Sequence, residues 1–258
     1  MKVQVLVAAM HQKDHELLDK MNIQSDVIVG NQCDFNSVEE FEYKGFNAKY
    51  LNFKERGVGL NRNNALMRAN GDICLIADDD MEYVDNYSKL VIEAYEKLPK
   101  ADVIVFNLIE EKPTRYIIKK IKKVNKFNYL RYGAARFSFR LKSVKEKAIY
   151  FNQCFGGGTE HSAGEDNIFL ATCLKNKLKV YSYPVYIAKL LEDRESSWFK
   201  GYDEKYLKDK GFLYKTISPR WWKLLCLQDA FRKRKKYNMS FIKAYKTMKK
   251  YTRRTQYY

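Results

Sequence analysis

The sequence predicts an α/β fold with a mostly parallel central sheet flanked by helices, followed by a basic helical C-terminal extension. Short apolar runs alternate with helically spaced repeats through roughly the first 110 residues. This alternation indicates strands connected by helices that cover both faces of a parallel sheet. A chain of 258 residues with 46% hydrophobic side chains is long enough to bury such a core.

Apolar runs in the first half predict strands at residues 3–9, 26–30, 48–53, 73–77 and 103–109. Helices are expected at 14–21 after the capping Asp14, at 60–70 before Gly71, and at 86–98 before Pro99. In a parallel sheet, ligands bind at the carboxyl ends of the strands. Since the run at 73–77 leads directly into Asp78-Asp79-Asp80, we expect these carboxylates at the ligand-binding edge.

The second half of the chain has a less regular pattern. We expect basic helix or loop from residue 112 to about 132, a strand at 135–141, a glycine turn at 155–158, a helix at 165–178 and a strand at 180–187. No internal repeat or low-complexity linker interrupts this order.

Cysteine usage and the N-terminus favour a cytoplasmic location. The five cysteines are scattered, without CxxC spacing, so neither a disulfide framework nor a zinc site is indicated. The N-terminus runs directly into a predicted strand, and no stretch has the 18 to 20 apolar residues that a membrane span needs, by the usual rough estimate. We therefore expect no signal peptide and no transmembrane helix.

The net charge of +17 is concentrated in two segments. Residues 112–147 hold 13 Lys and Arg against one acid, and residues 211–258 hold 14 against one. The rest of the chain carries a net charge of −8. Two basic segments on an acidic core indicate an anionic surface or ligand for those segments.

Three consecutive carboxylates at a strand end repel one another, so they favour a partner of opposite charge. Mg²⁺ or Mn²⁺ suits such a run, because these ions take oxygen ligands and complete their shell with water and phosphate. The acidic run therefore predicts a site for a divalent cation and a diphosphate. The alternative is an exposed acidic turn with no ligand.

Residues 57–83, GVGLNRNNALMRANGDICLIADDDMEY, carry a more specific pattern. A glycine turn, an Arg-Asn pair on a helix, a Gly-Asp and an apolar strand precede an Asp-x-Asp motif. This segment resembles the signature of family-2 glycosyltransferases with the GT-A fold, a Rossmann-like mostly parallel sheet, and further matches extend over roughly residues 3–200. The resemblance implies an inverting, hexosyltransferase-type enzyme that moves a sugar from a nucleotide-sugar to a saccharide, with Mn²⁺ or Mg²⁺ as cofactor.

The resemblance also implies a division of the chain. Residues 1–210 would form the catalytic domain, with a nucleotide-sugar-binding half at 1–111 and an acceptor half at 112–210. Residues 211–258 would form the basic aromatic extension. In the acidic run, Asp80 is the first choice for the metal, Asp78 serves the metal or the nucleotide, and Asp79 is assigned to nucleotide-sugar binding.

Further donor-side residues follow from the same resemblance. Ala8 and Met10 lie where the family has its first nucleotide-contacting loop, although the usual Pro-Thr-Tyr-Asn is here Ala-Ala-Met-His. Asn31 stands where an Asp normally contacts the base; an amide can bond a uracil edge, so a UDP-sugar is the expected donor. Arg62 is expected on the ribose or phosphate side, with a structural ion pair as the alternative.

The acceptor side centres on Glu165 and Asp166 behind a glycine-rich segment. In the family an acidic pair here supplies the general base, a role that falls to Asp166 with Glu165 as the backup. The alternative is an acid pair that complements a helix dipole. Gly157, His161 and Trp198 are expected to contact the acceptor, against the alternatives of a hydrogen-bonded loop histidine and a packed tryptophan.

The C-terminal extension combines apolar and basic residues. Residues 220–231 hold two Trp, three Leu and a Phe, and a run of five Lys and Arg follows at 232–236. This mixture predicts attachment to an anionic membrane surface on the inner face of the cell membrane. The resemblance supports it, because many such enzymes extend bacterial surface polysaccharides, including capsules, on polyprenyl-diphosphate-linked acceptors. The alternative is a solvated basic helix whose aromatics pack on the catalytic domain.

Two rival functions remain open from the residues alone. Basic, tyrosine-rich segments suit a nucleic-acid-binding protein, but no recognisable nucleic-acid module is present, and we expect no nucleic-acid partner. A sugar-nucleotide pyrophosphorylase shares the strand-helix alternation, but it would want a glycine-rich loop after the first strand. Residues 8–13 contain no glycine.

Overall fold

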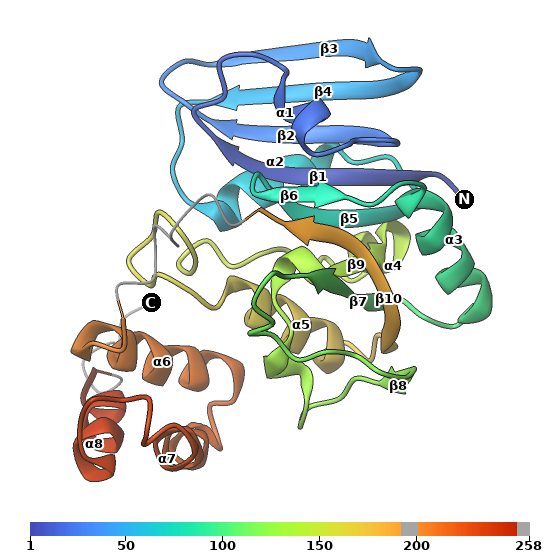
Figure 1. Ribbon diagram of the computed structural model, residues 1–258. Helices are drawn as coiled ribbons and strands as arrows, with labels where there is room; N and C mark the ends of the chain where they lie inside the picture. The colour runs from blue at the N-terminus through green and yellow to red at the C-terminus, as the bar shows by residue number, and fades with distance from the viewer. Residues whose placement is uncertain (192–200, 252–258) are drawn as a thin grey trace.

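The computed structural model describes residues 1–191 and 201–251 of the chain and contains a large sheet flanked by helices (Figure 1). The strands are β1 Val3–Met10, β2 Asp26–Gln32, β3 Ser37–Tyr43, β4 Phe46–Phe53, β5 Ile73–Asp78, β6 Met81–Tyr83, β7 Val103–Ile109, β8 Lys122–Lys123, β9 Phe137–Arg140 and β10 Val180–Leu190. The helices are α1 Leu17–Lys20, α2 Val58–Arg68, α3 Tyr87–Lys97, α4 Leu141–Glu146, α5 Glu165–Lys175, α6 Glu204–Ile217, α7 Trp222–Arg232 and α8 Phe241–Tyr251, with short 3₁₀ turns at Tyr129–Arg131 and Ala134–Arg136. The predicted α/β class is confirmed.

The sheet is mixed rather than mostly parallel. Its order is β3-β4-β2-β1-β5-β9-β7-β10-β6, with β8 paired to the side of β10. The strands from β4 to β5 run parallel, as do β7 and β10. β9 lies antiparallel between β5 and β7, and β3, β6 and β8 also pair antiparallel. The carboxyl ends of the parallel strands share one edge of this sheet.

The hairpin of β3 and β4 was not expected from the pattern of residues. β3 carries three glutamates and lies at the edge of the sheet, so it lacks the apolar run by which the buried strands are found. The connecting residues Lys44 and Gly45 have φ angles of 50° and 83°. Two successive residues with positive φ form the tight turn that joins antiparallel strands.

Two hydrophobic cores cover the opposite faces of the sheet. Alternate residues of β1 point to different cores, with Val5 and Val7 in one and Leu6 in the other. The first core includes α1 and α3, and the second includes α2, α4 and α5. Burial on both faces explains why the central strands are continuous apolar runs. The helix predicted at 14–21 is observed only as the shorter α1. Asp14 does not cap it, but accepts a hydrogen bond from the Glu16 N–H just before the helix.

The three C-terminal helices form a compact unit with its own core. α6, α7 and α8 share a cluster of buried residues that includes Tyr214, Cys226 and Met248. Gly211 lies where α6 crosses α8, and a β-carbon there would overlap the Met248 carbonyl oxygen. The domain boundary expected at residue 211 therefore lies inside α6, and the helical unit begins at Glu204.

The described helices were also compared with the length of a membrane span. Within residues 1–191 and 201–251, no helix is long and apolar enough to cross a bilayer.

Candidate active site

The acidic run lies at the carboxyl edge of the sheet, as predicted. Asp78 ends β5 and pairs in register with Ala8 of β1, while Asp80 immediately precedes β6. All three carboxylates are half-buried. The short β5 to β6 connection keeps the three side chains close together at the point where the parallel strands end.

The three aspartates have different partners. Asp78 Oδ1 accepts a hydrogen bond from Arg62 at 2.6 Å. Asp79 Oδ2 accepts from the Met10 N–H at 3.4 Å and from Gln12 Nε2 at 3.5 Å, so it turns toward the loop after β1. No side chain of the described residues hydrogen-bonds to the Asp80 carboxylate. Burial, with the charges of Asp78 and Asp79, raises the pKa of Asp80 to about 6.

Arg62 connects the acidic run to the acidic pair on α5. It lies in α2 and is 3% exposed. One guanidinium nitrogen is 2.6 Å from Asp78 Oδ1 and the other is 2.7 Å from Glu165 Oε1. Although burial opposes the charge, the two carboxylates keep the Arg62 pKa above its ordinary value. Arg62 thus forms the structural ion-pair bridge named as the alternative, and its contact with the donor ribose or phosphate stays a prediction.

Glu165 and Asp166 begin α5 after Gly164, whose φ of 123° and contact with Leu213 of α6 exclude a side chain. Glu165 is buried and engaged, since Arg62 donates to Oε1 and the Gly164 N–H donates to Oε2 at 3.1 Å. Asp166 is half-buried and accepts only the Asn167 N–H in the described part of the chain, at 2.6 Å. Burial, with the charge of Glu165, raises the Asp166 pKa well above its ordinary value.

A carboxylate with a raised pKa near the operating pH is suited to accept a proton from a hydroxyl. Asp166 has that property, whereas Glu165 is held by an arginine and positions Arg62 instead. The positive charges of Arg62 and Lys210 both act on Asp166 and limit the rise of its pKa. Lys210 comes from α6, a helix that the pattern of residues did not connect to the site.

Asn31, for which a contact with the base was predicted, contacts other protein groups in the structure. It is fully buried in β2. Its Oδ1 accepts from the Gln12 N–H at 3.0 Å, and its Nδ2 donates to the Gln12 carbonyl at 2.9 Å and to Asn52 Oδ1 at 2.8 Å. The amide therefore braces the turn after β1, and both of its N–H groups are already used.

A cavity of about 570 Å³ lies beside that turn. His11, Gln12, Lys13 and Asp14 line it together with Asp79 and the start of α1. His11 has a φ of 55°, which marks the sharp turn between β1 and this loop. These loop residues, rather than Asn31, present polar groups to the cavity. Because residues 8–11 depart from the family pattern, these loop residues could not be identified from the sequence.

The glycine-rich segment packs on the start of α2. The Gly157 carbonyl accepts the Val58 N–H at 2.9 Å, and Gly157 is buried. Gly156 has a φ of 101°, and a β-carbon there would overlap Val58. Gly157 thus packs against the start of α2, and its contact with the acceptor stays a prediction.

His161 is a hydrogen-bonded loop histidine, the alternative named for it. It is 5% exposed, and its Nδ1 lies 3.0 Å from Asp209 Oδ1 of α6. Its ring lies 4.3 Å from Phe212 and 4.8 Å from Phe155, centroid to centroid. His161 therefore attaches residues 155–164, called the catalytic loop below because they lead into Glu165 and Asp166, to the C-terminal unit. Trp198 lies outside the described residues.

Comparison with solved structures identifies the class of fold. S. aureus TarS 1–349 in complex with UDP-GlcNAc matches with a TM-score of 0.66 and 15% identity over 100% of this chain and 93% of that one. TarS 1–349 in complex with UDP matches with a TM-score of 0.62 and 17% identity over 100% of this chain and 93% of that one. The structure of S. aureus TarS matches with a TM-score of 0.63 and 16% identity over 100% of this chain and 56% of that one. The chain has the GT-A fold of the glycosyltransferases.

A model of a sequence family matches part of the chain. Residues 36–160 match the model described as Glycosyl transferase family 2. This match covers just under half of the chain and confirms the resemblance recognised in residues 57–83. No curated protein sequence matches the chain.

Proposed function

We propose that the chain transfers a sugar from a UDP-sugar to a saccharide acceptor with inversion at the anomeric carbon, in bacterial surface polysaccharide synthesis. The observation that carries this proposal is the Asp78–Arg62–Glu165 ion-pair chain, with distances of 2.6 and 2.7 Å. It couples the acidic run on the donor side to the helix start that bears Asp166. A donor phosphate and an acceptor hydroxyl bound at its two ends would meet between them.

The reaction is a single displacement. The acceptor oxygen bonds to C1 of the sugar while the bond from C1 to the diphosphate oxygen breaks. Asp166 takes the proton of the acceptor hydroxyl, and the nucleoside diphosphate leaves with the bonding electron pair. Glu165 and Arg62 hold the start of α5 in position, because a buried charge pair of this kind is geometrically specific.

The residues fit a divalent cation held by Asp80, with Asp78 as the second choice. Asp80 is close to two like charges and has no side-chain hydrogen-bond partner among the described residues, while Asp78 already shares Arg62. No three His, Cys, Asp or Glu side chains converge as a closed metal cage in the part of the chain described. An open site of one or two carboxylates is what Mg²⁺ and Mn²⁺ use when phosphate and water complete the shell. The cation would neutralise charge on the leaving diphosphate.

A hydrolysis screen of nucleotide-sugars with Mn²⁺ tests the function. The intact chain should release UDP from at least one UDP-sugar, and Asp80→Asn should lower that rate by about 100-fold or more, since a catalytic metal contributes several kcal/mol. Asp72→Asn is the matched control. Asp72 immediately precedes the first residue of β5, at the end of the strand opposite to Asp78, and it accepts a hydrogen bond from the Lys2 N–H. Absence of turnover with every donor, or full activity of Asp80→Asn, would refute the proposal.

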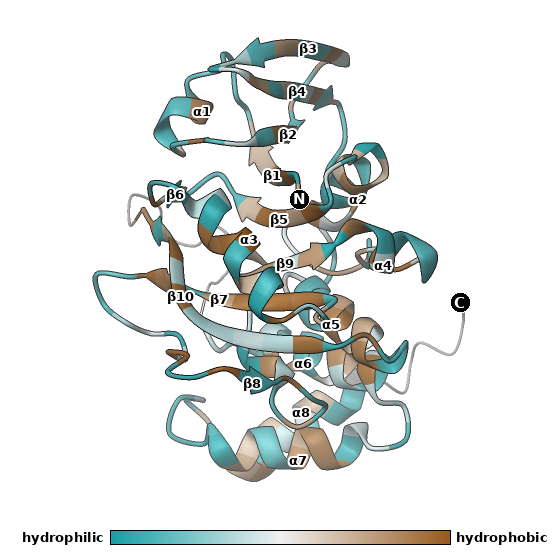
Figure 2. Cartoon of the chain, turned by 90° about the vertical axis from the view of Figure 1, so that its right-hand side faces the viewer, coloured by the Kyte–Doolittle hydropathy of each residue, from teal (hydrophilic) through white to brown (hydrophobic). Residues whose placement is uncertain are grey.

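We also propose that the C-terminal unit binds an anionic membrane surface, where a polyprenyl-diphosphate-linked acceptor would lie. Leu224, Leu227 and Phe231 of α7 and Trp221 just before it are between 38% and 66% exposed. Figure 2 shows the hydrophobic colouring along this helix, on the outside of the molecule. Exposed basic residues at 232 and 234–236 follow directly. An apolar face beside clustered cations matches an anionic interface.

Vesicle binding of α7 variants tests this attachment. Truncation at residue 211 is unsuitable, because it would remove Phe212 and Leu213, which pack against the catalytic loop. Leu224→Ser with Phe231→Ser should instead weaken binding to anionic vesicles by at least about tenfold, from lost apolar burial. Phe35→Ser with Val38→Ser, equally exposed at the opposite end of the molecule, should have no effect. Equal binding by both double variants would exclude α7 as the anchor.

A further inference from the structure

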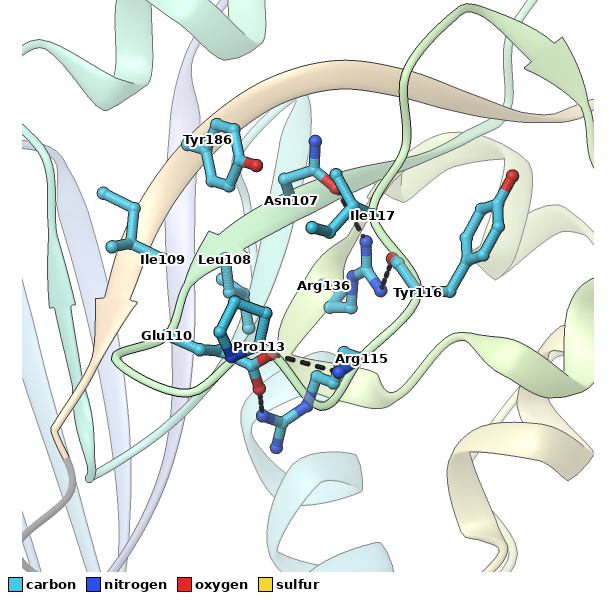
Figure 3. A pocket seen from close by; sticks show the side chains of 10 residues that line it. All are labelled: Asn107, Leu108, Ile109, Glu110, Pro113, Arg115, Tyr116, Ile117, Arg136 and Tyr186. Atoms are coloured by element: carbon cyan, nitrogen blue, oxygen red, sulfur yellow. Dashed lines mark hydrogen bonds and ion pairs between the residues drawn. The ribbon is translucent and has the colours of Figure 1, made fainter.

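A second cavity lies at the carboxyl ends of β7 and β10, on the acceptor side of the acidic run (Figure 3). Its volume is about 330 Å³. The lining residues come from the end of β7, the loop that follows it, β10 and the turn before β9: Asn107, Leu108, Ile109, Glu110, Pro113, Arg115, Tyr116, Ile117, Arg136 and Tyr186. None of them is assigned a role in the proposed transfer.

The cavity adjoins the acidic run. The Leu191 N–H, just after β10, donates to the Asp80 carbonyl at 2.8 Å, and Leu190 pairs with Met81 of β6. The positive charge of Arg115 acts on both Asp80 and Asp78. A molecule in this cavity would therefore lie next to the edge where the donor diphosphate is proposed to bind.

Arg136 gives the cavity a buried positive charge. It is 2% exposed and donates to the Phe106 carbonyl at 2.8 Å, the Tyr116 carbonyl at 2.8 Å and Asn107 Oδ1 at 3.0 Å. All three acceptors are neutral, and no carboxylate of the described residues forms an ion pair with this guanidinium. Burial, together with the charge of Arg115, lowers the Arg136 pKa to about 10. Such a charge is costly unless an anion offsets it.

The remaining charges around the cavity do not supply that anion. Glu110 is the single acid among the lining residues, and its carboxylate is already paired with Arg115 and accepts the Thr114 and Arg115 N–H groups. Arg131 adds a further cation, with its guanidinium carbon 4.6 Å from the centre of the Tyr116 ring. Arg115 and Arg136 thus line a hollow whose one acid, Glu110, is paired with Arg115, so no lining carboxylate offsets the charge of Arg136.

We propose that this cavity is an acceptor subsite that binds an anionic group, a phosphate or a carboxylate, carried by the acceptor saccharide. The inference rests on the proposed function and specifies the chemical class of its acceptor. Arg115 and Arg136 would bond the anion, since a guanidinium matches both groups in two-pronged geometry. Tyr116 and Tyr186, 43% and 41% exposed, form walls on which a sugar face can pack. The volume lies at the lower end of the range for small-ligand sites, roughly 300–1,000 Å³.

Binding of small probes, measured by calorimetry with a metal chelator present, tests the subsite. Glucose 6-phosphate and glucuronate represent the two sources of the anion, and glucose is the neutral match. At least one acidic sugar should bind more tightly than glucose, and Arg115→Gln should weaken it about tenfold, the loss of one charge-assisted hydrogen bond. Arg136→Lys keeps the positive charge but loses the planar guanidinium, so it should weaken acidic-sugar binding as well. Because it keeps the charge, this variant is informative even if a neutral substitution at this buried position prevents folding.

Lys126→Gln is the control, because Lys126 is an exposed cation of the same basic segment, just beyond β8 at the opposite end of β10. It should leave acidic-sugar binding unchanged. The subsite is refuted if acidic sugars bind no more tightly than glucose, or if saturating UDP displaces them. It is also refuted if Lys126→Gln weakens acidic-sugar binding as much as Arg115→Gln does. UDP binding with Mn²⁺ is measured in parallel. Its absence would refute the proposed function itself, whereas its presence without acidic-sugar binding would refute the subsite alone.

Discussion

Asp166→Asn is expected to lower the rate of sugar transfer by roughly 10²–10⁴-fold, the usual contribution of a general base. The amide is nearly isosteric and can still accept the Asn167 N–H, so the start of α5 should keep its structure. Donor binding should be unaffected, because the ion-pair chain to the acidic run passes through Glu165 and not through Asp166. Measurement of kcat for transfer and of UDP affinity on the same variant separates the two effects.

The pH profile gives an independent check on the same residue. Burial and the charge of Glu165 raise the Asp166 pKa to about 7. Because the base must be deprotonated to accept a proton, kcat/KM should fall as the pH drops through that value. An ordinary aspartate would place the acid limb near pH 4, by its typical pKa of about 3.9. Transfer by Asp166→Asn that keeps the wild-type rate and acid limb would exclude Asp166 as the base.

Arg62→Met should cause the largest loss of stability, about 3–5 kcal/mol in the free energy of unfolding. Removal of the guanidinium leaves Asp78 and Glu165 without their shared cation, and Glu165 is buried. At about 2–4 °C per kcal/mol for a chain of this size, the Tm should fall by roughly 6–20 °C. Thermal unfolding followed by circular dichroism measures the shift.

Two further variants make the Arg62 result interpretable. Arg68→Met changes an exposed arginine of the same helix and should shift the Tm by little. Arg62→Met combined with Glu165→Gln should recover part of the loss, because one of the two uncompensated carboxylates is then neutral. A fall in Tm for Arg62→Met no greater than that for Arg68→Met would show that the ion pairs contribute nothing to stability.

The elements that could be predicted from sequence are those whose residue types indicate directly whether the element is buried or exposed. β7 was predicted with its observed ends, because a continuous apolar run indicates a strand buried on both faces. The acidic run was placed correctly at the sheet edge for the same reason. β3 was missed because an edge strand is solvated and carries glutamates, so its pairing depends on β4 and on the turn between them.

Roles of buried polar residues depend on partners distant in the chain. The sequence does not show whether the Asn31 amide contacts a base or other protein groups. In the structure it bonds to the Gln12 carbonyl and to Asn52 on the neighbouring strand. Arg62 and Glu165 are 103 residues apart, and the ion pair between them could be named only as an alternative. Arg136 gave no sequence signal, because its distinguishing property, the lack of an ion-pair partner among the described residues, emerges only once the chain is folded.

The contacts of α6 with the catalytic loop set an order of assembly during synthesis. Asp209 holds His161, and Leu213 packs over Gly164, the residue before the acidic pair. Proteins emerge from the ribosome N-terminus first, and structure forms as its parts become available. The donor edge from β1 to β5 can therefore pair early, whereas the loop that presents Asp166 gains its supports only after residue 213 has emerged. If the proposed function holds, the nascent chain should bind UDP before it can transfer sugar.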